Sequence, residues 1–328
     1  MASFTSGFAT RLQQAWLVRG APAVALLPLA WVFGALTAIR RGLYRLGFLK
    51  AQRIDVPVLV VGNLVAGGAG KTPTVLAVVA LLRREGWHPG IVSRGHGRDS
   101  SEVLAVEPDT AATTAGDEPL LLRLRSGVPV FVGRDRVAAA RALRQRHPDT
   151  DVVVCDDGLQ HLRLARDAQV LVFDERGAGN GWLQPAGPLR EALPEQLPPR
   201  TVVIYNATSP STPLPGHMAR RSLAGAVALA DWWQGGRPAP QTLASLRGRP
   251  LLAAAGIARP QRFFAMLRDA GLDFVAHPLP DHHDYAELDW PAGTTDVVMT
   301  EKDAVKIVPH RAAGVRLWVA ALDFHFDA

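Results

Sequence analysis

From about residue 55 onward, short apolar runs alternate with segments whose apolar residues recur at helical spacing. The apolar runs that predict strands cover residues 56–62, 90–93, 128–132, 152–156, 170–173 and 202–205. Residues 73–84 and 134–146 have the helical spacing. Continuous apolar strands separated by helices are typical of a parallel sheet covered on both faces. We therefore predict an α/β fold.

The first predicted strand runs directly into a glycine-rich loop that ends in Gly-Lys-Thr. The loop residues predicted to bind a nucleotide are Val65, Ala66, Gly67, Gly68, Ala69, Gly70, Lys71 and Thr72. Glycines let backbone N–H groups surround phosphate oxygens, Lys71 reaches the terminal phosphates, and the Thr72 hydroxyl can ligate Mg²⁺. The strict motif has glycine where this chain has Val65. Even so, the pattern predicts a P-loop that binds a nucleoside triphosphate.

A second nucleotide signature is the apolar run 152–156, which ends in the neighbouring carboxylates Asp156 and Asp157. An acid at the carboxyl end of a strand beside a phosphate loop can hold Mg²⁺ between the outer phosphates. Successive strand residues point in opposite directions, so we expect one of the two to lie nearer the metal, and the pattern does not say which. A surface turn is the alternative interpretation.

A turn-rich stretch at 206–216 separates these strands from a second set. The later strands are predicted at residues 251–255, 274–277, 296–300 and 316–320. We therefore predict a P-loop nucleotide-binding domain at 55–205 and a smaller C-terminal α/β domain at 206–328. Kinases with two lobes hold the acceptor between them, so we expect the second domain to complete a substrate cleft.

Residues 1–54 form an apolar and basic N-terminal segment. The twenty residues 20–39 carry no charge and precede a basic cluster. The members of that cluster are Arg40, Arg41, Arg45, Lys50 and Arg53. The length suits a spanning helix, whereas Pro22, Pro28 and the Ala/Gly content favour a helix that lies on an anionic membrane surface. A buried helix of the protein core is a third interpretation. We predict a membrane-associating helix, attached peripherally or as a single anchor.

Composition narrows the class of protein further. With 48% apolar and 20% charged residues, the chain has the composition of a folded protein. A net charge of +6 favours an anionic partner. However, no basic run interleaved with aromatic residues is present, so we predict no nucleic-acid partner and see no sign of an obligate protein partner. The single Cys155 excludes a disulfide framework and suits a reducing compartment.

Several motifs in this order resemble the tetraacyldisaccharide 4'-kinase (lipid A 4'-kinase) family. They cover residues 65–72, 93–98, 116–119, 156–161, 185–191, 281–282 and 300–306. The resemblance extends from the apolar N-terminal segment to about residue 306. It implies an enzyme that uses ATP and Mg²⁺ to phosphorylate the 4'-hydroxyl of a tetraacylated glucosamine disaccharide 1-phosphate in lipid A biosynthesis. It also implies a location at the cytoplasmic face of the inner membrane.

The resemblance implies two further catalytic residues beside Lys71. In the family, the carboxylate at the position of Asp117 works with the histidine at the position of His282 to accept the proton of the sugar hydroxyl. Without the family, Asp117 in Gly-Asp-Glu-Pro suits a helix N-cap, and His282 beside His283 suits an exposed loop or a metal site. One departure concerns His96, where the family commonly has tyrosine, which leaves any substrate contact at this position open.

Other motif residues leave two interpretations open. Arg94 and Arg98 suit either phosphate binding or solvated loop positions. Residues 300–303, Thr-Glu-Lys-Asp, are a family marker or a helix cap. The glycine-rich stretch 174–190 suits a substrate lid. The alternative function for the whole chain is a membrane-associated P-loop NTPase switch that hydrolyses nucleotide without a small-molecule acceptor.

Overall fold

The computed structural model describes residues 15–95, 98, 100–288, 290–312 and 314–326. These residues form two compact units, which we describe separately. The first contains the chain up to residue 94 and residues 135–220, and the second contains residues 95–134 and 221–325. The second unit thus takes an early segment that the sequence pattern assigns to the nucleotide-binding domain. The predicted substrate cleft stays a prediction.

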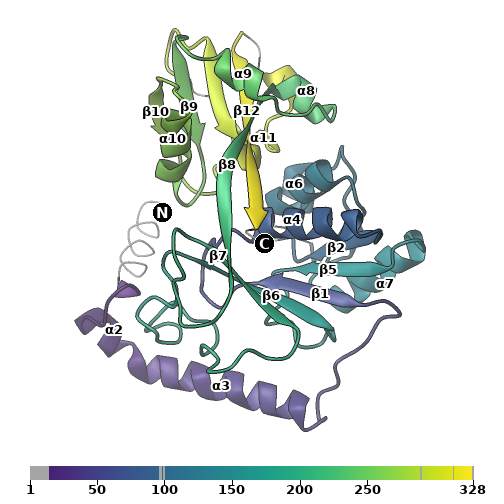
Figure 1. Cartoon of the computed structure of the whole chain (residues 1–328). Coiled ribbons are helices and arrows are strands. Elements are labelled where there is room, and N and C mark those ends of the chain that lie inside the picture. The colour runs from purple at the N-terminus through teal and green to yellow at the C-terminus, as the bar shows by residue number, and fades with distance from the viewer. Residues whose placement is uncertain (1–14, 96–97, 99, 289, 313, 327–328) are drawn as a thin grey trace. The chain divides into compact units, whose positions relative to one another are not determined.

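The first unit is built on a parallel sheet (Figure 1). Its strands are β1 (Val58–Gly62), β2 (Pro89–Ser93), β5 (Val152–Asp156), β6 (Ala168–Asp174) and β7 (Thr201–Asn206). They follow one another in the order β7-β6-β1-β5-β2, and each strand pairs in parallel with its neighbours in this order. Strands β1, β2 and β5 are almost wholly buried, as expected for a sheet with helices on its faces. The predicted α/β fold is confirmed.

Two helices of this unit match the predicted helical segments. Helix α4 (Lys71–Arg84) buries Val75, Val78 and Val79, which share one helical face. Helix α7 (Arg136–Arg146) begins where the Asp135 carboxylate accepts hydrogen bonds from two backbone N–H groups of its first turn. Helix α7 therefore begins where the Asp135 side chain caps it.

The parallel register brings the carboxyl ends of these strands to one edge of the sheet. Val61 of β1 pairs with Asp156 of β5, and Asp174 of β6 pairs with Asn206 of β7. The loops after β1, β5, β6 and β7 consequently start side by side. Ligands of open parallel sheets bind at this edge.

The N-terminal part of the first unit contains the short helix α2 (Ala21–Ala25) and the 19-residue helix α3 (Leu27–Arg45), which is apolar until its basic last turns. Within the described residues, no helix is long and apolar enough to cross a membrane. Ala30 is the buried residue of α3, whereas its large side chains are mostly exposed, with Trp31 at 69%. The interpretation of this segment as a buried core helix is therefore wrong.

The second unit has its own parallel strands, β10 (Val275–Pro278), β9 (Leu251–Ala255), β11 (Asp296–Thr300) and β12 (Arg316–Phe326), in that order. Helix α10 (Pro260–Asp269) packs Phe263, Phe264 and Leu267 into the core of this unit. The unit also contains α8 (Leu229–Trp233), α9 (Pro240–Ala244) and the short η1 turn (Pro309–Arg311). All four strands expected after residue 250 are confirmed.

Residues 95–134 of the second unit differ from the expected pattern. The run expected as a parallel strand at 128–132 forms β4 (Val130–Val132), which pairs antiparallel with β3 (Leu104–Ala105). Two helices precede it, α5 (Ala112–Ala115) and α6 (Asp117–Ser126). Strand β8 (His217–Ala228) was also not predicted, because arginines and a glycine interrupt its apolar run.

Candidate active site

The glycine-rich loop of the first unit lies between the end of β1 and the start of α4. Gly67 and Gly70 have φ angles of 91° and 90°, in the region that residues with a side chain rarely adopt. Because α4 begins at Lys71, the N–H groups of Lys71 and Thr72 have no acceptor within the helix, and Pro73 has no N–H. This helix N-terminus therefore offers backbone donors and a positive dipole to an anion.

Val65, the departure from the strict motif, has a structural role. Its side chain is 2% exposed, and its backbone forms an isolated bridge with Leu189. The following N–H, that of Ala66, donates to the Pro188 carbonyl over 2.8 Å. Residues 188–189 thus pair with Val65 and Ala66, the first residues of the loop. Where the strict motif has a flexible glycine, this chain therefore has a fixed backbone segment.

Two asparagines that the sequence pattern did not single out donate hydrogen bonds to carbonyl groups of the loop. Asn63 Nδ2 donates to the carbonyls of Val65, over 2.6 Å, and Gly67, over 3.1 Å. Asn206 Nδ2, at the end of β7, donates to the Ala69 carbonyl over 2.9 Å. Both asparagines are buried, so these hydrogen bonds contribute strongly to loop order.

Lys71 and Asp157 lie close together in the structure. Lys71 Nζ is 3.3 Å from Asn63 Oδ1 and 3.7 Å from Asp157 Oδ1. Arg190 Nη1 donates to the same Asp157 oxygen over 3.0 Å. Burial raises the pKa of the Asp157 carboxyl, but the charges of Lys71 and Arg190 outweigh it, so the pKa lies below its ordinary value. Asp157 is therefore an anion that faces two cations.

Asp156 has a different environment from its neighbour. Its side chain is buried, and Ser93 Oγ, at the end of β2, donates to its Oδ2 over 2.9 Å. The two carboxylates thus have separate partners, because Asp156 ends the strand whereas Asp157 lies in the turn that follows it. Asp157, with φ of 47°, is the one beside Lys71.

The oxygen donors at this edge suit a magnesium ion that arrives with a nucleotide. Within the described part of the chain, no group of three or more His, Cys, Asp or Glu side chains is arranged to hold a metal. Mg²⁺ commonly takes only one or two carboxylates and fills its shell with water and substrate phosphates. The Thr72 hydroxyl and the carboxylates Asp156 and Asp157 therefore fit such an ion.

The other predicted pair, Asp117 and His282, lies within the second unit. His282 Nδ1 is 3.2 Å from Asp117 Oδ2, although 165 residues separate them in the sequence. Asp117 is the first residue of α6, and Gly116 is its N-cap. The Asp117 side chain therefore does not cap the helix, and the interpretation of this residue as an N-cap is wrong. Its position in the first turn still suits a negative charge.

Two lysines beyond the predicted site complete this cluster. Lys306 Nζ is 3.4 Å from Asp117 Oδ2, and its side chain is only 4% exposed. Lys302 Nζ is 3.4 Å from His282 Nε2. Burial raises the pKa of Asp117, but the hydrogen bond with His282 and the charge of Lys306 lower it by more, so the net pKa is below its ordinary value. Both lysines lie in the motif 300–306 that carries the family resemblance, but the sequence pattern gave neither of them a role.

The remaining motif residues have structural contacts. His283 packs its ring against Tyr285, with 4.7 Å between ring centroids, and does not share the contacts of His282. Thr300 Oγ1 accepts a hydrogen bond from Asp303 N and caps α11 (Glu301–Ala304), which confirms the cap interpretation. His96 lies outside the described residues.

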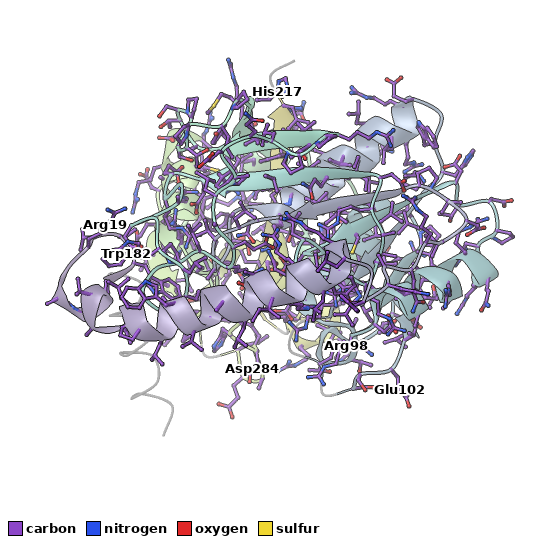
Figure 2. All side chains as sticks on the ribbon, turned by 90° about the horizontal axis from the view of Figure 1, so that it is seen from below. Arg19, Arg98, Glu102, Trp182, His217 and Asp284 are labelled. Atoms are coloured by element: carbon purple, nitrogen blue, oxygen red, sulfur yellow. The ribbon has the colours of Figure 1, made fainter. Side chains whose placement is uncertain are left out.

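Arg98 contacts the backbone of its own unit. Its Nε donates to the Thr114 carbonyl over 2.7 Å and its Nη2 to the Glu102 carbonyl over 3.2 Å (Figure 2). These bonds close the loop that precedes β3. Arg98 thus binds two backbone carbonyls through exposed hydrogen bonds, and phosphate binding by Arg98 stays a prediction.

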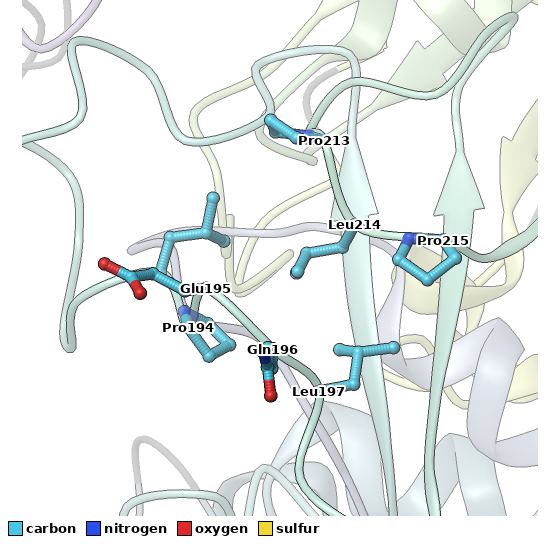
Figure 3. Close-up of a pocket in the computed structure, with 8 residues that line it drawn as sticks. Pro194, Glu195, Gln196, Leu197, Pro213, Leu214 and Pro215 are labelled. Carbon is cyan, nitrogen blue, oxygen red and sulfur yellow. The ribbon is translucent and has the colours of Figure 1, made fainter.

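An apolar pocket of about 510 Å³ lies between two loops of the first unit (Figure 3). It is lined by Leu193, Pro194, Glu195, Gln196, Leu197, Pro213, Leu214 and Pro215. None of the predicted site residues lines it. The nucleotide loop and this pocket are therefore separate features of the unit.

A glycine-rich loop follows a parallel strand, a lysine stands at the next helix N-terminus, and acids lie at the end of the neighbouring strand; together they define a P-loop nucleotide-binding protein. The particular family follows from comparison with known proteins. Residues 22–328 match the model of the tetraacyldisaccharide-1-P 4'-kinase family. The chain belongs to this family, which confirms the resemblance.

Relatives with this activity are similar over nearly the whole chain. The tetraacyldisaccharide 4'-kinase of Methylibium petroleiphilum is 61% identical and aligns with 95% of this chain and 89% of its own. The tetraacyldisaccharide 4'-kinase of Leptothrix cholodnii is 56% identical and aligns with 99% of this chain and 94% of its own. A crystal structure of LpxK from Aquifex aeolicus in complex with ATP has a TM-score of 0.77, with 26% identity, and covers 93% of this chain and 95% of that one.

These comparisons confirm the predictions of a kinase of lipid A biosynthesis and of ATP with Mg²⁺. They do not favour the NTPase switch, because that alternative has no phosphate acceptor. The predicted roles of individual site residues, and the attachment to a membrane surface, stay predictions.

Proposed function

We propose that Asp117 accepts the proton of the 4'-hydroxyl of an acylated glucosamine disaccharide 1-phosphate as this hydroxyl receives the γ-phosphate of ATP. The observation that carries this proposal is the contact of Asp117 with both His282 and the buried Lys306. The transition state of phosphoryl transfer is loose, so the enzyme has mainly to position the reactants and neutralise charge. A base that stays ionised can orient the hydroxyl and remove its proton late.

Asp117 lies beside Nδ1 of His282, and Lys302 and the more distant Asp281, with Oδ1 at 4.0 Å, lie beside Nε2. Lysine has only donors, so Lys302 Nζ, 3.4 Å away, makes Nε2 the acceptor nitrogen. Nδ1 then carries the ring proton and donates a hydrogen bond to Asp117 Oδ2. In this tautomer His282 fixes the direction of the Asp117 carboxylate and leaves its other oxygen, Oδ1, for the sugar hydroxyl.

On the first unit, Lys71 and the loop N–H groups would bind the outer phosphates of ATP. Thr72, Asp156 and Asp157 would hold the Mg²⁺ ion, which neutralises phosphate charge when it is bound. Asp157 lies beside Lys71 and directs its ammonium group before nucleotide arrives. Arg190 balances the charge of Asp157 on its other side.

The test is transfer of label from γ-labelled ATP to a detergent-dispersed tetraacyl disaccharide 1-phosphate. Asp117→Ala should lose labelled lipid by about a hundredfold while ADP binding persists, because the base acts on the acceptor and not on the nucleotide. Asp269→Ala, an exposed carboxylate of the same unit, is the matched control and should be unaffected. Normal transfer by Asp117→Ala would refute the assignment of the base.

The membrane proposal concerns α3, and we infer that it lies on the cytoplasmic face of the inner membrane. Leu29, Val32, Leu36 and Ile39 recur at helical spacing and are 58 to 62% exposed. The neighbouring Arg40 and Arg45 are also exposed, and each basic residue near an anionic leaflet contributes about 1 kcal/mol. Two members of the basic cluster are engaged elsewhere, since Arg41 pairs with Glu191 and Arg53 with Asp167. Attachment therefore depends chiefly on the apolar face of the helix.

Co-sedimentation with phosphatidylglycerol vesicles tests this inference. Leu36→Asp should reduce the bound fraction severalfold, since it puts a charge into the apolar face. Val275→Asp, at an equally exposed apolar position of β10, is the matched control. Equal binding of both variants and the unmodified enzyme would exclude α3 as the attachment surface.

A further inference from the structure

The phosphate loop receives a second set of hydrogen bonds from the glycine-rich stretch 174–190, where the sequence suggested a substrate lid. Arg176 Nη1 donates to the Ala66 carbonyl over 3.2 Å, and Nη2 donates to the Gly68 carbonyl over 3.1 Å. The two terminal nitrogens of one guanidinium thus bind alternate carbonyls of the loop. Neither the loop motif nor the family resemblance singles out Arg176.

Arg176 is itself fixed in place by the strand that precedes it. Its Nε is 3.0 Å from both carboxylate oxygens of Asp174, and its backbone N–H donates to Asp174 Oδ1 over 3.0 Å. Asp174 is the last residue of β6 and is 2% exposed. The guanidinium is therefore oriented by a rigid element, and its rigid planar fork loses little freedom in forming these bonds.

The hydrogen bonds from Arg176 to the two loop carbonyls determine where the neighbouring N–H groups of the loop point. In a trans peptide the C=O and the following N–H lie on opposite sides, so binding of the Ala66 and Gly68 carbonyls turns the N–H groups of Gly67 and Ala69 away from Arg176. Gly67 also needs to be glycine here, because a Cβ would lie 3.2 Å from Arg176 Nη1 at a φ of 91°. The arginine and the glycine thus fit one loop conformation.

We propose that Arg176 is a positioning residue that holds the phosphate loop in its nucleotide-binding conformation through the carbonyls of Ala66 and Gly68. It acts on the nucleotide through the loop and makes no contact with the reacting groups. The proposal rests on the proposed nucleotide site of the first unit and is independent of the acceptor. Without the arginine, the loop populates other conformations, and apparent affinity falls in proportion to the competent fraction.

The experiment compares Arg176→Met and Arg176→Lys with the matched control Arg144→Met. Arg144 lies in the same unit, its side chain is 19% exposed against 20% for Arg176, and it likewise pairs with an acid, Asp55, and a backbone carbonyl, that of Pro148. Binding of a fluorescent ADP analogue with Mg²⁺ is measured first, so that the result does not depend on kinase activity. Kinetics with ATP and glycolipid, and thermal unfolding, follow.

We expect Arg176→Met to weaken ADP and ATP binding by the same factor, about tenfold if a tenth of the loop population stays competent. kcat at saturating ATP and KM for the glycolipid should remain within about twofold of the values for Arg144→Met. Arg176→Lys should also bind weakly, because an ammonium group cannot bind two carbonyls and Asp174 together in the geometry of the fork. It keeps the charge and can be tested even where the Met variant does not fold.

Two results would overturn the proposal. Nucleotide binding by both Arg176 variants that equals that of Arg144→Met would mean that the loop does not need the fork. Loss of ATP affinity without loss of ADP affinity, accompanied by a fall in kcat and restored by Lys, would mean that Arg176 contacts the transferred phosphate directly as a charge.

Discussion

Each unit of the molecule contains a lysine beside an aspartate, and the two pairs are built differently. Lys71 Nζ lies 3.7 Å from Asp157, with side-chain exposures of 11% and 31%. Lys306 Nζ lies 3.4 Å from Asp117, with exposures of 4% and 18%. Burial raises the pKa of both carboxyl groups, but the net pKa of each is below the ordinary value. The charges of Lys71 and Arg190 lower that of Asp157, whereas the hydrogen bond with His282 and the charge of Lys306 lower that of Asp117.

The difference concerns what the lysine is available to do. Lys71 extends from the N-terminus of α4 and is more exposed than Lys306, so incoming phosphates can share its charge. Lys306 is enclosed by Asp117, by Asp303 at 3.8 Å and by the ring of Tyr285. We therefore expect Lys71 to act on the nucleotide and Lys306 to act on the aspartate beside it.

Among the variants that test this difference between the two lysines, Lys71→Ala should lower kcat the most. Loss of a cation aimed at the transferred phosphate should lower kcat about a thousandfold, since fixed charges at the developing transition-state charge are among the largest catalytic contributions. Initial rates of lipid phosphorylation measure the effect. Arg84→Ala, which removes an exposed cation from the last turn of the same helix, is the control. A change of less than twofold would remove Lys71 from the mechanism.

Lys306→Met should have a smaller effect on rate and a characteristic effect on pH dependence. The groups that face Asp117 are His282 and Lys306, and Lys306 also faces Asp303. Because the charge of Lys306 lowers the pKa of Asp117, its removal should raise that pKa. The acid limb of the kcat/KM profile then moves to higher pH, and kcat falls about tenfold.

The same variant has a consequence for stability. A carboxyl whose pKa is lowered by folding stabilises the protein fully above its unfolded pKa of about 3.9, and this contribution is lost as pH falls through the folded value. With Lys306→Met the folded pKa should lie closer to the unfolded value, so this contribution and the pH range over which it is lost should both be smaller, as acid unfolding would record. Lys306→Arg keeps the charge and should keep both profiles near those of the unmodified enzyme. An unmoved acid limb in Lys306→Met would show that Lys306 does not tune Asp117.

The two pairs also differ in how much the sequence reveals. Lys71 and Thr72 belong to one contiguous motif, and the strand that carries Asp157 is a continuous apolar run, so local pattern suffices. Asp117 and His282 meet only in the folded unit, and no periodicity relates positions so far apart; a family resemblance was needed to pair them. Lys306, Asn63 and Arg176 were missed, because a lysine, asparagine or arginine that binds one buried partner has no local signature.

Secondary structure follows the same division. Strands buried on both faces were predicted correctly, because a run such as Val152–Asp156 is apolar at nearly every position. The antiparallel pairing of β4 with β3 and the long β8 were not, since strand direction and partner depend on tertiary packing and not on the apolar run itself.

Lys302→Met should have the smallest effect on kcat and stability. This variant tests whether a lysine near Asp117 and His282 must also be buried, as Lys306 is, to influence them. Lys302 is also close to the catalytic pair, with Nζ 3.4 Å from His282 Nε2 and 3.5 Å from Glu118, but its side chain is 22% exposed. Ion pairs that water reaches are worth only about 0–1 kcal/mol, so unfolding free energy should change by no more than that. kcat should fall about threefold at most, because Nδ1 of His282 still donates to Asp117. If Lys302→Met instead equals or exceeds Lys306→Met in both rate and acid limb, the buried lysine has no special role, and the ammonium beside His282 controls the base.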